Sequence, residues 1–230
     1  FPIGELLKPQ VRRIAAQAGL VTADKKDSQG ICFVGKVKLP EFLRQRLAAR
    51  EGDIVEIPAD SPVYRVREEA LAAAPDEAAR RAIRAQPYVY APSDGKVIGR
   101  HHGAHFFTVG QRKGLDVGGR PEPLFVIATD TQANILYVGQ GKSHPGLYRR
   151  ALWVPARDEH WVREDLRPPL GEGMRVLSRI RYRQPLEQAT LWRTEQGVCL
   201  DFDRPQSAVT AGQFATAYLG EELFFSGPIA

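Results

Sequence analysis

Two apolar runs near the end of the chain read Ala189-Thr190-Leu191-Trp192 and Val198-Cys199-Leu200-Asp201-Phe202. Each run is short enough to be a single strand, and the residues between the two can form a turn. Runs at 174–177 and 214–218 have the same character. Because several short strands at such spacing are typical of a barrel, we expect a small closed β-barrel in this part of the chain.

Further strand signals, separated by glycine-rich turns, precede the barrel. These strands are expected at 54–57, 96–99, 106–109, 125–128 and 135–138. Helices are expected at about 9–18, where Pro9 suits a first turn and Gly19 an end, and at 39–50. Alanine, arginine and glutamate dominate 68–84, with prolines on both sides, so we expect a helical insertion there.

The fold class predicted from these patterns is mostly β with a few helices. We divide the chain into a helix and loop at 1–35, a central α+β or β domain at 36–146 and the barrel at 147–230. The helical insertion occupies about 58–92 of the central domain. A length of 230 residues is enough for two modest hydrophobic cores.

Composition restricts the classes of function. Hydrophobic residues make up 43% of the chain and charged residues 26%, which is typical of a globular protein and not of a disordered one. The formal net charge of +5 suits a polyanionic partner, although charge alone is weak evidence. No secretion signal and no apolar stretch of about 20 residues is present, so we expect no membrane contact.

The chain contains two cysteines, Cys32 and Cys199, too few for a disulfide framework. We therefore expect a cytoplasmic location. The alternation around Cys199 predicts a core position. The first residue is Phe1, and we expect the chain to be a fragment or a processed piece.

The first candidate site is the loop Asp27-Ser28-Gln29-Gly30-Ile31-Cys32-Phe33. A lone cysteine after a polar, glycine-containing loop is placed for partial exposure, and Lys25 and Lys26 could favour the reactive thiolate. Taken alone, the local composition favours a simpler interpretation, in which Cys32 is a small apolar residue at the start of a strand.

Two basic segments are candidates for binding a nucleic acid. In 103–115, a strand is expected to deliver Gln111, Arg112 and Lys113 onto a glycine-bracketed loop that can approach phosphates. In 178–184, three arginines alternate with Ile180 and Tyr182, so a strand would place the arginines on one face. A solvated hairpin and a basic outer strand of a barrel are the alternative interpretations.

The three histidines His101, His102 and His105 suggest zinc, but no second pair of ligands lies at a suitable spacing. We therefore expect no metal site. No phosphate-binding Walker loop, dinucleotide fingerprint or Ser/His/Asp arrangement is evident.

Five segments, in this order, resemble those of the bacterial and organellar tRNA-specific 2-thiouridylases. They are 25–33 with Cys32, Thr108-Val109-Gly110-Gln111-Arg112-Lys113-Gly114-Leu115, Asn134-Ile135-Leu136-Tyr137-Val138-Gly139-Gln140-Gly141, Ile180-Arg181-Tyr182-Arg183-Gln184, and Ala208-Val209-Thr210-Ala211-Gly212-Gln213. The resemblance covers nearly the whole chain, and it changes the interpretation of Cys32 from a structural residue to a functional one.

The resemblance implies a three-part enzyme with an ATP pyrophosphatase domain, a small central domain and a C-terminal barrel similar to those of translation factors. This chain resembles the second and third parts, with 1–35 as the end of the first. The implied activity is 2-thiolation of the wobble uridine of tRNA. The base is adenylated at its C2 oxygen, a persulfide on Cys32 supplies sulfur, and a second cysteine from the ATP domain completes the exchange.

The resemblance also implies site residues and partners. Arg181, Tyr182 and Gln213 match tRNA contacts, and Gln111, Arg112 and Lys113 are further candidates. Asp27 and Ser28 are supporting candidates that shape the Cys32 loop. The implied partners are tRNA, a sulfur donor such as a cysteine desulfurase or a sulfur-relay protein, and the ATP pyrophosphatase domain. That domain would bind ATP with Mg, and no cofactor is expected in this chain.

Two departures from the family matter. The Ser-Gly-Gly-x-Asp-Ser type of ATP-binding loop and the first catalytic cysteine are not in these residues, so we expect the chain to be inactive by itself. The segment 68–84 is longer than the family pattern suggests. A solvated helix is the favoured interpretation of this segment, and tRNA contact through Arg80, Arg81 and Arg84 is the alternative. The rival functions are a non-catalytic RNA-binding module and a sulfur carrier that works without RNA.

Overall fold

The computed structural model describes residues 3–25 and 49–230, and the chain separates into two compact units, Phe1–Ala48 and Ala49–Ala230. In the first unit, helix α1 spans Lys8–Gln17. Pro9 lies in its first turn, and Gly19, with a φ of 67°, follows its end. The helix expected at 39–50 falls, up to residue 48, outside the described residues.

The second unit begins with a four-stranded mixed sheet. Its strands are β1 (Gly52–Glu56), β2 (Lys96–His101), β3 (Leu124–Asp130) and β4 (Ile135–Gln140), in the order β2-β1-β4-β3. β1 and β4 are parallel, and the other neighbours are antiparallel. A parallel pair needs a long crossover, and the residues between β1 and β4 supply it.

Both faces of this sheet are buried. Ile54 packs with Leu136 and other apolar side chains on one face, whereas Val55 packs with Tyr137 on the other. Ile54 and Val55 are both 0% exposed. Since successive side chains of a strand point to opposite faces, β1 must be apolar at adjacent positions, as it is.

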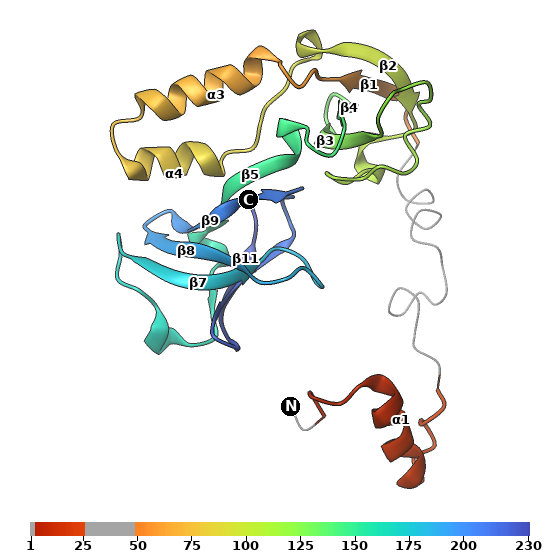
Figure 1. Ribbon diagram of the computed structural model, residues 1–230, viewed down its shortest axis with the longest axis vertical. Helices are drawn as coiled ribbons and strands as arrows, with labels where there is room; N and C mark the ends of the chain where they lie inside the picture. The colour runs from red at the N-terminus through yellow and green to blue at the C-terminus, as the bar shows by residue number, and fades with distance from the viewer. Residues whose placement is uncertain (1–2, 26–48) are drawn as a thin grey trace. The chain divides into compact units, whose positions relative to one another are not determined.

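Two helices form the segment between β1 and β2. They are α3 (Pro62–Ala73) and α4 (Glu77–Ala85), and they lie side by side in Figure 1. Asp76 begins α4 by accepting a hydrogen bond from the Ala79 amide. α4 is not a solvated helix, because Ala85 is buried and the Arg81 guanidinium lies 3.7 Å from the centre of the Trp192 ring.

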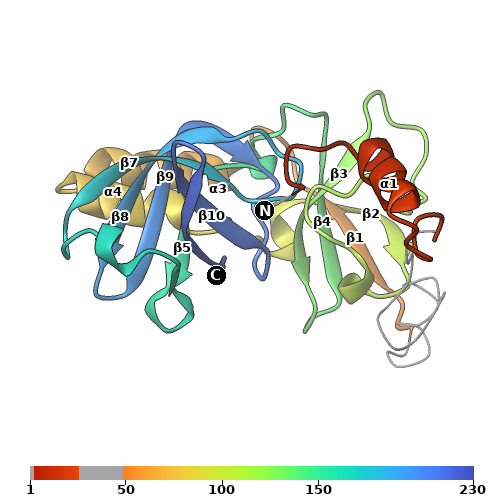
Figure 2. The same cartoon turned by 90° about the horizontal axis from the view of Figure 1, so that it is seen from below.

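A seven-stranded antiparallel sheet forms the rest of the unit. Its order is β5-β9-β8-β7-β10-β11-β6. The strands are β5 (Tyr148–Pro155), β6 (His160–Trp161), β7 (Gly173–Arg179), β8 (Glu187–Thr194), β9 (Gly197–Ser207), β10 (Phe214–Leu219) and β11 (Glu222–Pro228). Figure 2 shows these strands beside the four-stranded sheet.

The two faces of β9 are buried in different ways. Val198, Leu200 and Phe202 point into the main core of the seven-stranded sheet. Cys199 and Asp201 point to the opposite face, where Ala85 of α4 packs against Cys199. Cys199 is therefore buried, as expected, and its burial raises the pKa of the thiol to about 12.

The seven-stranded sheet is a half-barrel. Among the described residues the ladder runs from β5 to β6 without closing, so the expectation of a fully closed barrel is wrong. β6 has only two residues, and within the described part of the chain it pairs with β11 and not with β5. One hydrogen bond, from the Ala230 amide to the Trp153 carbonyl at 2.9 Å, joins the end of the chain to β5.

The remaining differences from the expected elements are local. The strand expected at 106–109 is absent, and the short 3₁₀ helix Ala104–Phe106 leads into a turn there. Strands β5, β6 and β11 have no counterpart in the expected set. Arg149 and Arg150 interrupt the apolar pattern of β5, and β6 has only two residues. The other 3₁₀ helices are Pro92–Asp94, Pro145–Leu147, Ala156–Asp158 and Glu164–Leu166. No helix in the described ranges is long and apolar enough to cross a membrane.

Candidate nucleic-acid interface

The loop with Cys32, Asp27 and Ser28 lies outside the described residues, as does Lys26. Their roles therefore stay predictions. The two basic segments and Gln213 are within the described part of the chain.

The glycine-bracketed loop 110–114 is held by short local hydrogen bonds. The Gly110 amide donates to the Val126 carbonyl of β3 at 2.7 Å. The Gln111 side chain turns onto its own loop, where its Oε1 accepts from the Thr108 amide at 3.2 Å. The Gln111 side chain thus organises the loop. This structural role is enough to account for a glutamine at the position, even if the side chain contacts no ligand.

Arg112 and Lys113 are the exposed cations of this loop. Leu115, which follows, is buried in the core of the four-stranded sheet and fixes the end of the loop. Arg112 also lines a cleft of about 560 Å³ that the segment 114–124 forms. The loop therefore presents two cations on a fixed backbone, which is an arrangement suited to phosphate contact.

The basic segment 178–184 leaves strand β7 after Arg179 and turns, so the expectation of a strand face with three arginines is wrong. β7 ends at Arg179, and Arg183 has a φ of 70°, in the left-handed region that strands do not use. Ile180 is 0% exposed in the half-barrel core. This buried anchor ends the strand, and the backbone reverses directly after it.

The reversal gives Arg181 and Tyr182 different surroundings. Arg181 donates a hydrogen bond from Nη2 to the Ser207 carbonyl at 2.5 Å, which holds its guanidinium on the half-barrel. Tyr182 is 88% exposed, and the Arg183 guanidinium lies 5.4 Å from the centre of its ring. A positioned cation and an exposed aromatic ring are the two features that single-stranded RNA contacts use.

The two basic segments meet at a small cavity of about 230 Å³. Gly110, Phe125 and Lys142 line it from the side of the four-stranded sheet, and Arg181 and Ser207 line it from the half-barrel. The sequence separated these residues by up to 97 positions, and the fold brings them to one junction. We call this cavity the junction pocket.

Gly110 is close to Ala208 at the edge of the junction pocket. Gly110 has a φ of 86°, and a Cβ placed on it would lie 2.5 Å from the Ala208 Cβ. The Ala208 amide donates to the Leu147 carbonyl at 2.7 Å, so its backbone is fixed as well. Only glycine satisfies both the backbone angle and the close approach.

Gln213 does not line the junction pocket. It is partly buried just before β10, and its carbonyl accepts a hydrogen bond from the Ile229 amide at 2.8 Å. Its side-chain Oε1 is buried and has no hydrogen-bond partner among the described residues.

The three histidines have separate surroundings. His101 is buried, its Nδ1 accepts a hydrogen bond from the Gly103 amide at 2.9 Å, and burial lowers its pKa. His105 packs on Phe106 with ring centres 4.1 Å apart, and His102 is exposed. Residues 3–25 and 49–230 contain no group of three His, Cys, Asp or Glu side chains that could hold a metal ion.

Three family models match the chain. They are the tRNA methyl transferase HUP domain at 1–36, the tRNA methyl transferase PRC-barrel domain at 79–140 and the aminomethyltransferase β-barrel domain at 154–229. Over all 230 residues the chain is 55% identical to the tRNA-specific 2-thiouridylase MnmA of Flavobacterium johnsoniae. The chain belongs to the tRNA-specific 2-thiouridylase family.

Other 2-thiouridylases are similar along the same length. The chain is 52% identical to the tRNA-specific 2-thiouridylase of Christiangramia forsetii and 42% identical to that of Karelsulcia muelleri, in both cases over all 230 residues. It spans 58% of the length of the Flavobacterium and Christiangramia proteins and 57% of the Karelsulcia protein. The similarity therefore covers the whole of this chain but little more than half of each of those relatives.

For this member of the 2-thiouridylase family, sequence reasoning missed Lys142, Leu147, Tyr148 and Ser207 among the residues that line the junction pocket. Lys142 directly follows the segment 134–141, whose ending Gly139-Gln140-Gly141 indicates a turn. That turn could have indicated a cation at a loop. Ser207 contributes its backbone carbonyl, and no feature of the sequence marks a carbonyl for such a role.

Proposed function

We propose that this chain is the tRNA-binding and sulfur-relay part of an enzyme that 2-thiolates the wobble uridine of tRNA. The observation that carries the proposal is the overall 55% identity to a tRNA-specific 2-thiouridylase across all 230 residues, a match whose extent includes the segment with Cys32. The pairing of a positioned Arg181 with an exposed Tyr182 beside the junction pocket supports the tRNA-binding half.

The proposed chemistry is a series of sulfur transfers. The Cys32 thiolate attacks the outer sulfur of a donor persulfide, whose S–S bond breaks, and the donor leaves as a thiolate. The terminal sulfur of the Cys32 persulfide then attacks C2 of the adenylated uridine, and AMP leaves with the former C2 oxygen. A second thiolate attacks the Cys32 sulfur, which releases thiouridine and forms a disulfide, and a thiol reductant reopens that disulfide.

The residues present indicate which steps of the proposed reaction this chain carries out and which belong to the ATP pyrophosphatase domain. We assign adenylation, with ATP and Mg, and the second thiolate to the ATP pyrophosphatase domain, outside these residues. Within this chain, Cys32 carries sulfur, and Asp27 and Ser28 shape its loop. Contacts to tRNA are assigned to Arg181, Tyr182 and Gln213, with Arg112 and Lys113 as phosphate contacts beside a loop that Gln111 organises.

Sulfur loading tests the relay role. The chain is incubated with a cysteine desulfurase and cysteine, and intact masses are compared for the wild type, Cys32→Ser and Cys199→Ala. We expect the wild type and Cys199→Ala to gain one sulfur, about 32 Da, and Cys32→Ser to gain none. Cys199→Ala is the matched control, because that thiol is 1% exposed.

A gain of sulfur that does not depend on Cys32, or no gain in any of the proteins, would contradict the relay role. Retained tRNA binding in that case would favour the rival function, a non-catalytic RNA-binding module. Sulfur loading without any tRNA binding would instead favour a sulfur carrier that works without RNA.

Removing the exposed ring of Tyr182 is expected to weaken tRNA binding without affecting the fold. For Tyr182→Ala we expect about a fivefold or larger loss of affinity, since stacking of a base on an aromatic ring contributes about 1–3 kcal/mol. Leu170→Ala is the control, because Leu170 is 53% exposed and precedes β7, whereas Tyr182 follows it. Filter binding and circular dichroism give the two readouts, and equal affinities of the two variants would remove Tyr182 from the interface.

A further inference from the structure

A second cavity, of about 420 Å³, lies where α3 and α4 face the half-barrel. Arginines from both sides line it, namely Arg67, Arg80, Arg84, Arg149 and Arg150, together with Tyr88. No carboxylate is among the described residues that line it. We call this cavity the arginine pocket. Tyr148 is the one lining residue that it shares with the junction pocket among the described residues.

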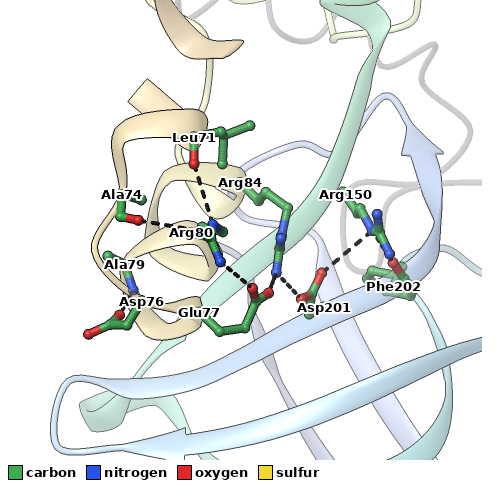
Figure 3. A network of polar contacts seen from close by, with 10 residues as sticks. All are labelled: Leu71, Ala74, Asp76, Glu77, Ala79, Arg80, Arg84, Arg150, Asp201 and Phe202. Carbon is green, nitrogen blue, oxygen red and sulfur yellow. Dashed lines mark hydrogen bonds and ion pairs between the residues drawn. The ribbon is translucent and has the colours of Figure 1, made fainter. Parts of the chain in front are cut away.

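Two carboxylates compensate part of this charge. Glu77 contacts Arg84 at 2.5 Å and Arg80 at 3.5 Å, and Asp201 contacts Arg84 at 2.6 Å. Arg150 lies 4.0 Å from Asp201. Figure 3 shows these contacts as one network between α4 and β9, with Arg84 between the two acids.

The other two arginines have carbonyl partners instead of acids. Arg67 donates to the Pro87 carbonyl at 2.9 Å. Arg149 donates to the Ala85 and Val209 carbonyls at 3.0 and 3.1 Å, and it is only 9% exposed. Five guanidinium groups thus share two carboxylates among the described residues, and three positive charges are in excess.

Burial makes this excess charge unfavourable in the protein alone. Burial and, to a lesser degree, the positive charge of Arg67 lower the pKa of Arg149 to about 10. Burial also lowers the pKa of Arg67. A desolvated cation gains most from a nearby anion, because water no longer screens the pair. The Arg84 Nε is also buried without a hydrogen-bond partner in the described part of the chain.

A purely structural role explains only part of the cluster. The contacts of Glu77 and Asp201 with Arg84 attach α4 to β9, and they account for Arg80 and Arg84. Among the described residues, Arg67 and Arg149 have no carboxylate partner. Arg150 has only the 4.0 Å contact with Asp201, a carboxylate that already pairs with Arg84. The Arg150 side chain is 53% exposed, and its only hydrogen bond in the described residues uses Nε, so its terminal nitrogens can reach a ligand.

We propose that the arginine pocket binds a phosphate group, and that this group is a backbone phosphate of the RNA. Guanidinium groups match the planar, bidentate geometry of phosphate oxygens. The Arg67 guanidinium lies over the Tyr88 ring, 3.7 Å from its centre, so a cation–π contact holds this guanidinium at the wall of the pocket. The RNA source rests on the proposed function, whereas the phosphate site itself does not.

The test compares Arg150→Gln with Arg157→Gln. Both variants lose one positive charge from the same stretch of chain, but Arg157 is 84% exposed and does not line the pocket. Thermal unfolding is measured with inorganic phosphate and with chloride at equal ionic strength. Affinity for tRNA is measured over a range of salt concentrations, and Arg150→Lys, which retains the charge, tests for rescue.

We expect phosphate to raise the midpoint of unfolding of the wild type and Arg157→Gln, but not that of Arg150→Gln. The slope of log K for tRNA against log salt should fall by about 0.7 to 1 for Arg150→Gln alone, the contribution of one phosphate contact. Arg150→Lys should restore part of both effects. Circular dichroism establishes that each variant is folded.

The outcomes separate the two parts of the proposal. A phosphate effect that depends on Arg150, with an unchanged tRNA slope, would overturn the RNA source and support a site for free phosphate. Equal behaviour of Arg150→Gln and Arg157→Gln in both measurements would overturn the phosphate site. If the wild type binds no tRNA, the proposed function fails, while an Arg150-dependent phosphate effect would still support the site.

Discussion

Replacing Gly110 with alanine is expected to lower the free energy of unfolding by about 3 kcal/mol. About 1 kcal/mol comes from the φ of 86°, which a residue with a Cβ adopts at a cost. The remainder, about 2 kcal/mol, comes from overpacking, because the new Cβ would lie 2.5 Å from the Ala208 Cβ and the backbone would have to shift. Urea denaturation measures the change.

Gly114→Ala is the matched control for Gly110→Ala. Gly114 has a φ of 82°, but the nearest atom to its Cβ would be the Gln111 Nε2 at 3.9 Å, an ordinary contact. We therefore expect Gly114→Ala to cost only the backbone part, about 1 kcal/mol. Equal losses for the two variants would mean that the loop and Ala208 can separate freely, and the junction pocket would then not be a fixed feature.

Arg84→Met is expected to lower the free energy of unfolding by about 2 to 3 kcal/mol. The side chains of Arg84 and Asp201 are 15% and 14% exposed, and their contact at 2.6 Å joins α4 to β9 (Figure 3). Without Arg84, the Asp201 carboxylate stays buried, and its one remaining cationic partner among the described residues is Arg150, 4.0 Å away. The large effect arises mainly from this uncompensated charge and less from the lost attraction.

Arg175→Met supplies the comparison. Arg175 makes two hydrogen bonds of 2.8 Å to Asp203, so its geometry is at least as good, but the two side chains are 55% and 50% exposed. Water screens that pair, and we expect a loss below about 1 kcal/mol. Urea denaturation of both variants measures the difference, and a similar small loss for Arg84→Met would show that α4 is held by apolar packing alone.

The fold class follows from local patterns that the sequence displays directly. Runs such as 189–192 and 198–202 are apolar, short and bounded by turns, and each of them is a strand in the structure. The run 106–109 has a similar composition but is not a strand. The 3₁₀ helix Ala104–Phe106 begins after Gly103, whose φ is 139°, and in the described part of the chain no strand pairs with 106–109. Strand formation depends on a partner, which composition cannot show.

The candidate interface was predictable in its residues and not in its geometry. The alternation in 178–184 suggested one arginine face, but the burial of Ile180 ends the strand, so Arg181 and Tyr182 separate. The arginine pocket was even less accessible to sequence reasoning. Its members lie on α3, α4 and β5, and no local spacing relates them.

Residue types within short segments were enough to predict the mostly β fold class, the strand that carries Cys199 and the family resemblance. Tertiary packing decides which element covers the face of β9 that carries Cys199 and Asp201. It also decides which cations share a cavity. Alternation places these two residues opposite Val198 and Leu200, but whether that face meets water or α4 depends on packing between segments distant in sequence. The burial of Asp201 and the grouping of the arginines around one cavity arise only from that packing.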